Sequence, residues 1–369
     1  MNRYLAPLFL AGSLLALVAP PCAAADKVRE LPAAATPMPG CGETAGKAGR
    51  PLREQGYWSV GGIEQWLTIE SANCNNPVLL FVHGGPGNPV SPFSHAMYGA
   101  WAKDFTLVQW DQRGAGKTFA RNPHTADASL SLEQMSADGI EVAQLLQRHL
   151  GQRKIILTGS SWGSVLGIMM AKQRPDLFHA YIGVSQMVSA SANESAAYTL
   201  TLAAATKAGD AKTVAALQEI GPPPRSSPRA FGILRRAIRA YERKVTIAAP
   251  AKWWNKEAQY ATPAALAADE QGEEYSFMQF VGLKGDGMLS RIDLPALGTR
   301  FEIPIYLLQG QEDLLTPAVV TQPYFDSLEA PAKAMVMVPK AGHDPNPALL
   351  DAQWKVLKER VLPGLRGNQ

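Results

Sequence analysis

The sequence contains few cysteines and histidines and almost no excess of one charge. It has three Cys and six His in 369 residues, and 35 Lys and Arg stand against 32 Asp and Glu. No Lys/Arg-rich tract with interleaved aromatic residues is present, so a nucleic-acid partner is not expected. No HExxH motif or comparable His and carboxylate spacing is present either, so we expect no metal and no cofactor.

The sequence also lacks an apolar run of about 18 or more residues, the length that a membrane-spanning helix needs. The N-terminal run "LAPLFLAGSLLALVA" is shorter, follows an arginine and ends at the small-residue stretch "CAAA". This pattern is typical of a signal peptide over residues 1–25 that is cleaved before Asp26. We therefore expect a periplasmic or secreted protein with no stable membrane span. Lipid attachment at Cys22 is the alternative, which the two prolines before it disfavour.

Cleavage at this point would leave two cysteines, Cys41 and Cys74. A cysteine pair in an exported protein, without CxxC or His spacing, favours a disulfide over a metal or catalytic site. Such a bond would connect the loop-rich N-terminal leader, residues 26–56, to the folded body.

Short apolar runs alternate with longer helix-like stretches through most of the chain. The runs are "PVLLFVHGG", "FTLVQWDQRG", "KIILTGSSWG", "AYIGVSQ", "IPIYLLQG" and "AMVMVPKAGH". This rhythm predicts an α/β fold with a mostly parallel sheet covered by helices on both faces, formed by residues 57–185 and 301–369. Residues 186–300 lack strand-like runs and are rich in Ala and helix formers, so we expect a helical cap inserted into the sheet domain.

The stretch "TGSSWGSVLG" places Ser161 between Gly159 and Gly163, where an apolar run ends and a helix-like stretch begins. GxSxG at a strand-to-helix turn exposes the serine oxygen and is typical of a nucleophile elbow. An ordinary Ser-rich turn is the alternative for this short pattern.

The partners that a nucleophilic serine needs occur later in the chain, in the order Ser, Asp, His. Asp313 follows the run "IPIYLLQG", and His343 follows "AMVMVPKAG". The other five histidines precede the cap, so His343 is the candidate base. Glu312 and Asp344 lie next to the two candidates and remain possible alternatives for the acid.

The Gly-rich stretch "FVHGGPG" follows the first of the buried runs. Glycines let the backbone approach a substrate oxygen closely, so this loop could supply one donor of an oxyanion hole. We expect the donors to be the N–H groups of Gly85 and of Trp162, which follows the serine. A simple Gly/Pro turn is the alternative.

Two other patterns do not indicate a site. "DQRGAGKT" ends like a phosphate-binding loop, but Asp111 stands where that motif needs its first glycine. Arg235, Arg239 and Arg243 are spaced four apart in "RRAIRAYERK", which predicts a solvent-exposed helix face.

The segments "HGGPG" (83–87), "DQRGAGKT" (111–118) and "GSSWGS" (159–164), in this order and spacing, resemble the prolyl aminopeptidase (proline iminopeptidase) family of α/β-hydrolases. The resemblance covers roughly 57–185 and 300–365. It implies a serine peptidase that removes N-terminal residues, typically proline, without a metal. By position it implies that Ser161 is the nucleophile, that Asp313 and His343 complete the triad, and that Gly85 and Trp162 are the oxyanion donors. It also implies a pocket for the substrate's amino end, framed by the cap and by the HGGPG loop with Gly84.

The cap departs from this family, because "MVSASANESAAY" stands where a segment of the type RGIF is expected. Glu194 is the first acidic residue of this segment and is our candidate for binding the substrate's α-ammonium group. Glu273 and Glu274 are the next candidates. A solvated helix carboxylate is the alternative for all three.

These features together predict an exported aminopeptidase that acts on short peptides or another small substrate. A carboxylesterase or lactonase with the same triad is the first alternative. A non-catalytic ligand-binding protein on the same scaffold is the second. An aspartate nucleophile, as in epoxide hydrolases, is disfavoured because residue 161 is serine.

Overall fold

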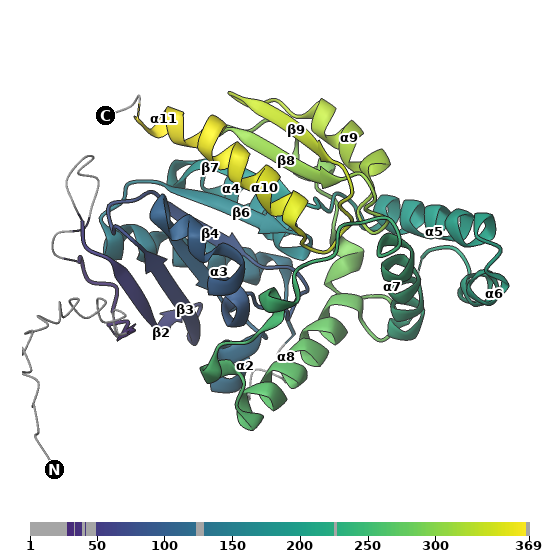
Figure 1. The fold of residues 1–369 in the computed structure, drawn as a ribbon, viewed down its shortest axis with the longest axis horizontal. Coiled ribbons are helices and arrows are strands. Elements are labelled where there is room, and N and C mark those ends of the chain that lie inside the picture. The colour runs from purple at the N-terminus through teal and green to yellow at the C-terminus, as the bar shows by residue number, and fades with distance from the viewer. Residues whose placement is uncertain are drawn as a thin grey trace, which may run out of the picture.

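The computed structural model describes residues 28–32, 34–38, 41, 49–122, 129–224 and 227–366 (Figure 1). The predicted signal peptide, residues 1–25, and Cys22 lie outside these described residues. None of the helices in the described ranges is both long and apolar enough to cross a membrane.

The described residues form a nine-stranded sheet in the order β1-β2-β3-β5-β4-β6-β7-β8-β9. β3 pairs antiparallel with both β2 and β5, and every other neighbouring pair is parallel. The strands are β1 (Arg29–Glu30), β2 (Leu52–Val60), β3 (Ile63–Ser71), β4 (Val78–Val82), β5 (Thr106–Trp110), β6 (Ile155–Ser160), β7 (Phe178–Val184), β8 (Ile305–Gly310) and β9 (Lys333–Val338). The predicted α/β class with a mostly parallel sheet is confirmed.

The six predicted apolar runs correspond to β4 through β9, whereas β1, β2 and β3 were not predicted. β2 alternates buried and partly exposed residues along "LREQGYWSV", so it carries no continuous apolar run. β2 begins at Leu52, ahead of the expected core boundary at 57.

Helices cover both faces of the sheet. The helices next to the sheet are α1 (Ser94–Tyr98), α2 (Gly116–Arg121), α3 (Leu132–Leu150), α4 (Trp162–Gln173), α9 (Ala318–Ser327), α10 (Pro347–Val356) and α11 (Leu362–Arg366). Along β4, Leu80 belongs to the same buried cluster as Leu146 of α3 and Leu166 of α4. Its neighbour Leu79 belongs to a second cluster, which includes Leu357 beyond the end of α10. The alternation arises because successive strand residues point to opposite faces.

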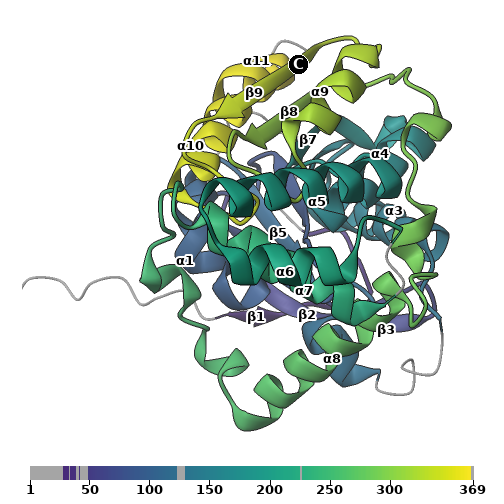
Figure 2. The ribbon, with the colours of Figure 1, turned by 90° about the vertical axis from the view of Figure 1, so that its right-hand side faces the viewer.

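Between β7 and β8, the described residues form helices and turns and add no strand to the sheet. The long helices of this segment are α5 (Ala190–Lys207), α6 (Ala211–Ile220), α7 (Pro228–Glu242) and α8 (Pro263–Val281), and Figure 2 shows them on one side of the molecule. Proline occupies the first turn of α7 and of α8, where its missing N–H costs nothing. The Ser227 and Thr262 side chains cap these two helices.

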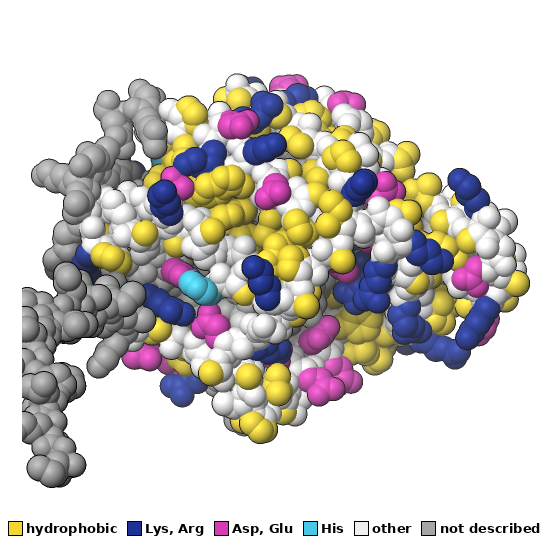
Figure 3. Space-filling model, in the orientation of Figure 1, with side chains coloured by type: hydrophobic (Ala, Val, Ile, Leu, Met, Phe, Trp, Pro, Cys, Tyr) yellow, Lys and Arg dark blue, Asp and Glu magenta, His cyan; other side chains and the backbone are white. Residues whose placement is uncertain are grey.

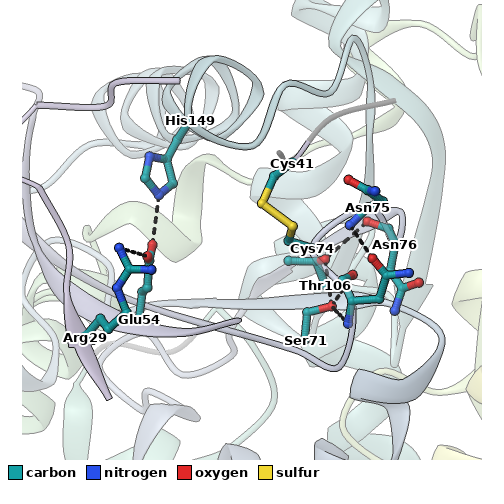
Figure 4. The surroundings of a disulfide bond; sticks show 10 residues. Arg29, Cys41, Glu54, Ser71, Cys74, Asn75, Asn76, Thr106 and His149 are labelled. Carbon is teal, nitrogen blue, oxygen red and sulfur yellow. Dashed lines mark hydrogen bonds and ion pairs between the residues drawn. A yellow bond between two sulfur atoms is a disulfide. The ribbon is translucent and has the colours of Figure 1, made fainter. Parts of the chain in front are cut away.

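The N-terminal segment lies against β2 and α3 (Figure 4). Cys41 and Cys74, the predicted pair, are joined by a disulfide. The backbone N–H of Met38 donates to the carbonyl of His149 at 2.9 Å. The buried His149 ring contacts the carbonyl of Thr36 through Nδ1 at 2.9 Å, so polar contacts and the disulfide hold the segment on the sheet.

Candidate active site

Ser161 lies at the sharp turn between β6 and α4, in the middle of the sheet. Its backbone angles are φ 52° and ψ −120°, a conformation that non-glycine residues rarely adopt. A Cβ on Gly159 would lie 2.3 Å from the carbonyl oxygen of Gly163, and one on Gly163 would lie 2.0 Å from that of Val82. Both glycines are therefore required for this turn, as the GxSxG pattern predicts.

The structure brings Ser161, His343 and Asp313 into one hydrogen-bonded chain. His343 Nε2 lies 2.8 Å from Ser161 Oγ, and His343 Nδ1 lies 3.1 Å from Asp313 Oδ2. Asp313 stands on the loop after β8 and His343 on the loop after β9, at the carboxyl edge of the parallel strands. The arrangement is that of a nucleophile, a base and an orienting acid.

The Asp313 carboxylate is fully buried and has several donors. It accepts the backbone N–H groups of Leu315 and Thr316 at 2.9 and 2.8 Å, and the Thr316 hydroxyl at 2.7 Å. Burial alone would raise the pKa of Asp313, but the charge of His343 and the hydrogen bonds from His343 and Thr316 hold it well below its usual range. Asp313 therefore stays ionised, and it is Asp313, not Glu312, that contacts His343.

The two expected oxyanion donors are Gly85, in the HGGPG loop, and Trp162, which directly follows Ser161. Within the described part of the chain, neither the N–H of Gly85 nor that of Trp162 has a hydrogen-bond acceptor. Trp162 is the first residue of α4, where N–H groups have no partner inside the helix. A Cβ on Gly84 would lie 3.4 Å from the Cβ of Ser161, so the HGGPG loop lies directly beside the nucleophile.

A buried network connects the three motifs that carry the family resemblance. Gln112 donates its side-chain amide to the carbonyl of His83 at 2.9 Å and accepts the indole N–H of Trp162 at 3.0 Å. His83 Nδ1 donates to the carbonyl of Gly84 at 2.8 Å, and Nε2 accepts the backbone N–H of Gln112 at 3.2 Å. Burial lowers the pKa of His83 to about 4, so its ring is neutral and can accept at Nε2.

The cap reaches the HGGPG loop through α8. A Cβ on Gly87 would lie 2.9 Å from the Cα of Glu273 and 2.9 Å from the Cβ of Ser276. Ser276 Oγ donates to the carbonyl of Gly114 at 2.7 Å, which ties α8 to the "DQRGAGKT" turn as well. Glycine at position 87 therefore lets α8 pack closely on the loop beside the nucleophile.

The three candidate carboxylates of the cap are placed differently. Glu194 is half-buried in the first turns of α5, whereas the side chains of Glu273 and Glu274 on α8 are exposed.

Basic side chains gather over the cap, at the right of Figure 3. The interpretation of Arg235, Arg239 and Arg243 as a solvent-exposed face is correct for Arg239 and Arg243 and wrong for Arg235. Arg235 Nη2 and Arg239 Nε each lie 3.2 Å from the carboxylate of Asp344, and the Arg235 side chain is only 20% exposed. A regular four-residue spacing does not reveal a partner from a distant loop, so the sequence could not show this contact.

Sequence reasoning missed three polar residues around the triad: Gln112, Thr316 and Glu242. All three are buried. A signal existed for Glu242, because it continues the buried stripe of α7 that includes Leu234 and Ile238. A carboxylate on an apolar helix stripe needs a polar partner.

Glu242 finds its partners on the two loops that carry the acid and the base. Its Oε1 accepts the N–H of Leu314 at 2.8 Å, and its Oε2 accepts the N–H of His343 at 3.0 Å. Burial, together with the negative charge of Asp313, raises the pKa of Glu242 to about 7, against the opposing effects of His343 and the two N–H donors.

A cavity of about 650 Å³ lies at the opposite edge of the sheet, among Pro77, Lys154, Phe178 and Pro304. These residues stand at or just before the amino ends of β4, β6, β7 and β8, so the cavity is separate from the triad. In the described ranges, no group of three or more His, Cys, Asp or Glu side chains is arranged to hold a metal ion.

Comparison with known proteins shows the family to which the chain belongs. Residues 77–347 match the family described as alpha/beta hydrolase fold. The chain is 29% identical to a probable aminopeptidase, YbaC, of Bacillus subtilis, over 78% of this chain and 90% of that protein. It is 26% identical to the proline iminopeptidase of Neisseria gonorrhoeae, over 84% and 96% of the two chains.

Solved structures share the fold at low sequence identity. The crystal structure of VinJ matches with a TM-score of 0.62 and 17% identity, over 84% of this chain and 98% of that chain. The proline iminopeptidase of Mycobacterium smegmatis matches with a TM-score of 0.57 and 19% identity, over 85% and 98%. The chain belongs to the α/β-hydrolase fold family. Within that family it is similar to the proline iminopeptidases, as the three motifs predict.

Proposed function

We propose that the chain is an exported serine hydrolase that releases N-terminal residues, proline foremost, from short peptides. The observation that carries the proposal is the contact of 2.8 Å between Ser161 Oγ and His343 Nε2, with Asp313 behind the imidazole. The relatives named as aminopeptidases support the substrate class.

The first half of the reaction forms an acyl-enzyme. Ser161 Oγ attacks the carbonyl carbon of the peptide bond after the N-terminal residue, and its proton passes to His343 Nε2. Asp313 keeps the imidazole in the orientation with Nδ1–H toward the carboxylate and stabilises the imidazolium. The free N–H groups of Gly85 and Trp162 bind the oxyanion, a contribution of about 3 kcal/mol per donor in comparable enzymes.

The second half restores the serine. His343 gives its proton to the leaving nitrogen as the C–N bond breaks, and the shortened peptide leaves. A water molecule then loses a proton to His343 and attacks the ester carbonyl. The ester bond to Ser161 breaks, and the serine oxygen regains the proton from His343.

An aminopeptidase must also recognise a free α-ammonium group. We propose that Glu194 supplies the carboxylate, because it lies half-buried in the first turns of α5, close in sequence to the end of β7. Ser185, just beyond β7, donates its hydroxyl to the carbonyl of His343 at 3.3 Å, so the chain enters α5 from the neighbourhood of the base. Glu273 is the second candidate, because its backbone adjoins the HGGPG loop.

Export belongs to the same proposal. The N-terminal pattern of a signal peptide and the bond between Cys41 and Cys74 both suit an oxidising compartment outside the cytoplasm. Detection of a mature N-terminus at Asp26 in the periplasm or medium of the producing cell would test this part.

Three chromogenic substrates test the activity. Proline 4-nitroanilide carries a free amine, N-acetylproline 4-nitroanilide lacks it, and 4-nitrophenyl acetate is a neutral ester. We expect turnover of the first with kcat/KM at least about 10-fold above the second, since a charged hydrogen bond is lost on acetylation. Turnover of the ester alone would make the protein a carboxylesterase or lactonase. No turnover of any substrate would favour a ligand-binding protein.

A further inference from the structure

We infer that Glu242 is a positioning residue through which the cap holds the catalytic acid and base loops in register. The inference rests on the proposed serine-hydrolase function. The Glu242 carboxylate, at the end of α7, accepts one N–H from each loop, at Leu314 and at His343.

The two contacts are placed where they fix the reacting groups. Leu314 directly follows Asp313, and the other donor is the backbone N–H of His343 itself. A shift of either loop would change the distance of 3.1 Å between Asp313 and the imidazole or that of 2.8 Å between the imidazole and Ser161. One side chain from the cap therefore constrains two members of the triad at their backbone.

The loop around His343 is built to admit this carboxylate. A Cβ on Gly342 would lie 2.6 Å from Glu242 Oε2, so only glycine leaves room for it there. Glu242 is 4% exposed. Burying a carboxylate next to the charged Asp313 is costly, and an apolar side chain would fill the same space at a lower cost. The N–H groups of Leu314 and His343, which both donate to Glu242, explain why a carboxylate occupies this position.

Other residues of α7, and residues that follow the helix, also contact the loop that carries His343. Arg235 and Arg239 both pair with Asp344, which follows His343. Beyond the helix, the N–H of Ile247 donates to the carbonyl of Lys340 at 2.9 Å, ahead of His343. The base loop is thus held by the cap on both sides of the imidazole, and Glu242 provides the contact at the imidazole's own backbone.

A cap carboxylate could either position the triad or bind the substrate's amine. No contact of Glu242 with Ser161 Oγ is described, and both its oxygens already accept N–H groups. A positioning role predicts equal losses on every substrate of the triad, because the geometry of the base is shared. A role in binding the substrate's amine predicts a loss on amine-bearing substrates alone.

The test is the variant Glu242→Gln, measured on proline 4-nitroanilide and on 4-nitrophenyl acetate. Glutamine keeps the shape but has one acceptor oxygen, so one loop N–H would face an NH2 group. We expect kcat to fall by about 10- to 100-fold on both substrates, the cost of a misplacement near 1 Å, with KM changed less than about twofold. Glu219→Gln, on the exposed surface of cap helix α6, is the matched control and should retain wild-type kcat.

Three results would overturn the inference: an unchanged kcat, a change in KM alone, or a loss confined to the proline substrate. If Glu242→Gln does not fold, Asp344→Asn provides the second test. It removes the ion pairs by which α7 holds the base loop just after His343. That variant should lower kcat several-fold on both substrates, and wild-type kcat in it would contradict the inference. Wild-type protein that turns over neither substrate would instead overturn the proposed function, and this inference with it.

Discussion

The indole N–H of Trp162 donates to the side-chain oxygen of Gln112 at 3.0 Å. The same Gln112 side chain donates to the carbonyl of His83. Trp162 follows the nucleophile and His83 begins the HGGPG loop, so a single buried amide connects the segments that carry the two proposed oxyanion donors. The spacing between those donors depends on Gln112.

Replacing Gln112 should therefore impair catalysis more than binding. Gln112→Leu leaves the indole N–H and the carbonyl of His83 buried without partners, at a cost of about 1–3 kcal/mol for each group. We expect kcat to fall by about 10-fold or more on amide and ester substrates while KM changes little, since the oxyanion exists only along the reaction path. Gln322→Leu, on the exposed face of α9, is the control. A KM effect without a kcat effect would contradict this role.

The sequence predicted β4 to β9 because each contains a continuous apolar run, and of these β4 to β8 are buried almost throughout, whereas the edge strand β9 is mostly half-buried. It also placed Ser161, Asp313 and His343 at strand ends that the structure brings together. Strands β2 and β3 escaped prediction because polar residues interrupt their apolar residues, so neither strand carries a continuous apolar run. Gln112 escaped because its partners, the Trp162 indole and the carbonyl of His83, lie on distant segments. For Glu242 the buried stripe of α7 indicates a polar partner but does not show which loops provide it.

Asp111 should make the stability of the protein depend on pH. Burial raises its pKa from 3.8 to about 7, despite hydrogen bonds from the Ser91 hydroxyl and the Lys117 N–H. Between these two values the folded protein keeps the proton while the unfolded chain releases it, so the free energy of unfolding falls as pH rises. In the variant Asp111→Asn the side chain carries no carboxyl proton, so this contribution to the pH dependence of stability is absent.

We therefore expect wild type to lose about 2 kcal/mol relative to Asp111→Asn between about pH 5 and about pH 7, and nothing further above that range. Urea denaturation of both proteins across this range measures the difference. Asp351→Asn, an exposed site on α10, should run parallel to wild type. Parallel curves for Asp111→Asn as well would refute the buried proton.

Glu194 should set the preference for a free amine. Glu194→Gln should reduce kcat/KM for proline 4-nitroanilide by about 1.5–3 kcal/mol, the range for a hydrogen bond to a charged group. It should leave 4-nitrophenyl acetate nearly unaffected. The matched variant Glu219→Gln, exposed on α6, should change neither. Equal losses on both substrates would show that Glu194 is structural.

The bond between Cys41 and Cys74 should stabilise the protein. It closes a loop with a sequence separation of 33 residues, for which chain entropy gives about 3–4 kcal/mol. The double variant Cys41→Ser with Cys74→Ser should lose this amount in chemical denaturation while keeping its activity, since the bond is far in the chain from the triad. Two thiols that titrate in unreduced, native mature protein would rule the bond out.

The most direct test of the serine-hydrolase mechanism is peptide mapping after treatment with an active-serine phosphonate. Wild type should lose activity as a single phosphonyl group appears on the peptide that contains Ser161. Ser161→Ala should remain unlabelled and have kcat lowered by about a thousandfold or more. His343→Ala should label far more slowly than wild type. A phosphonyl group on any other residue, or turnover in Ser161→Ala near that of wild type, would contradict the account.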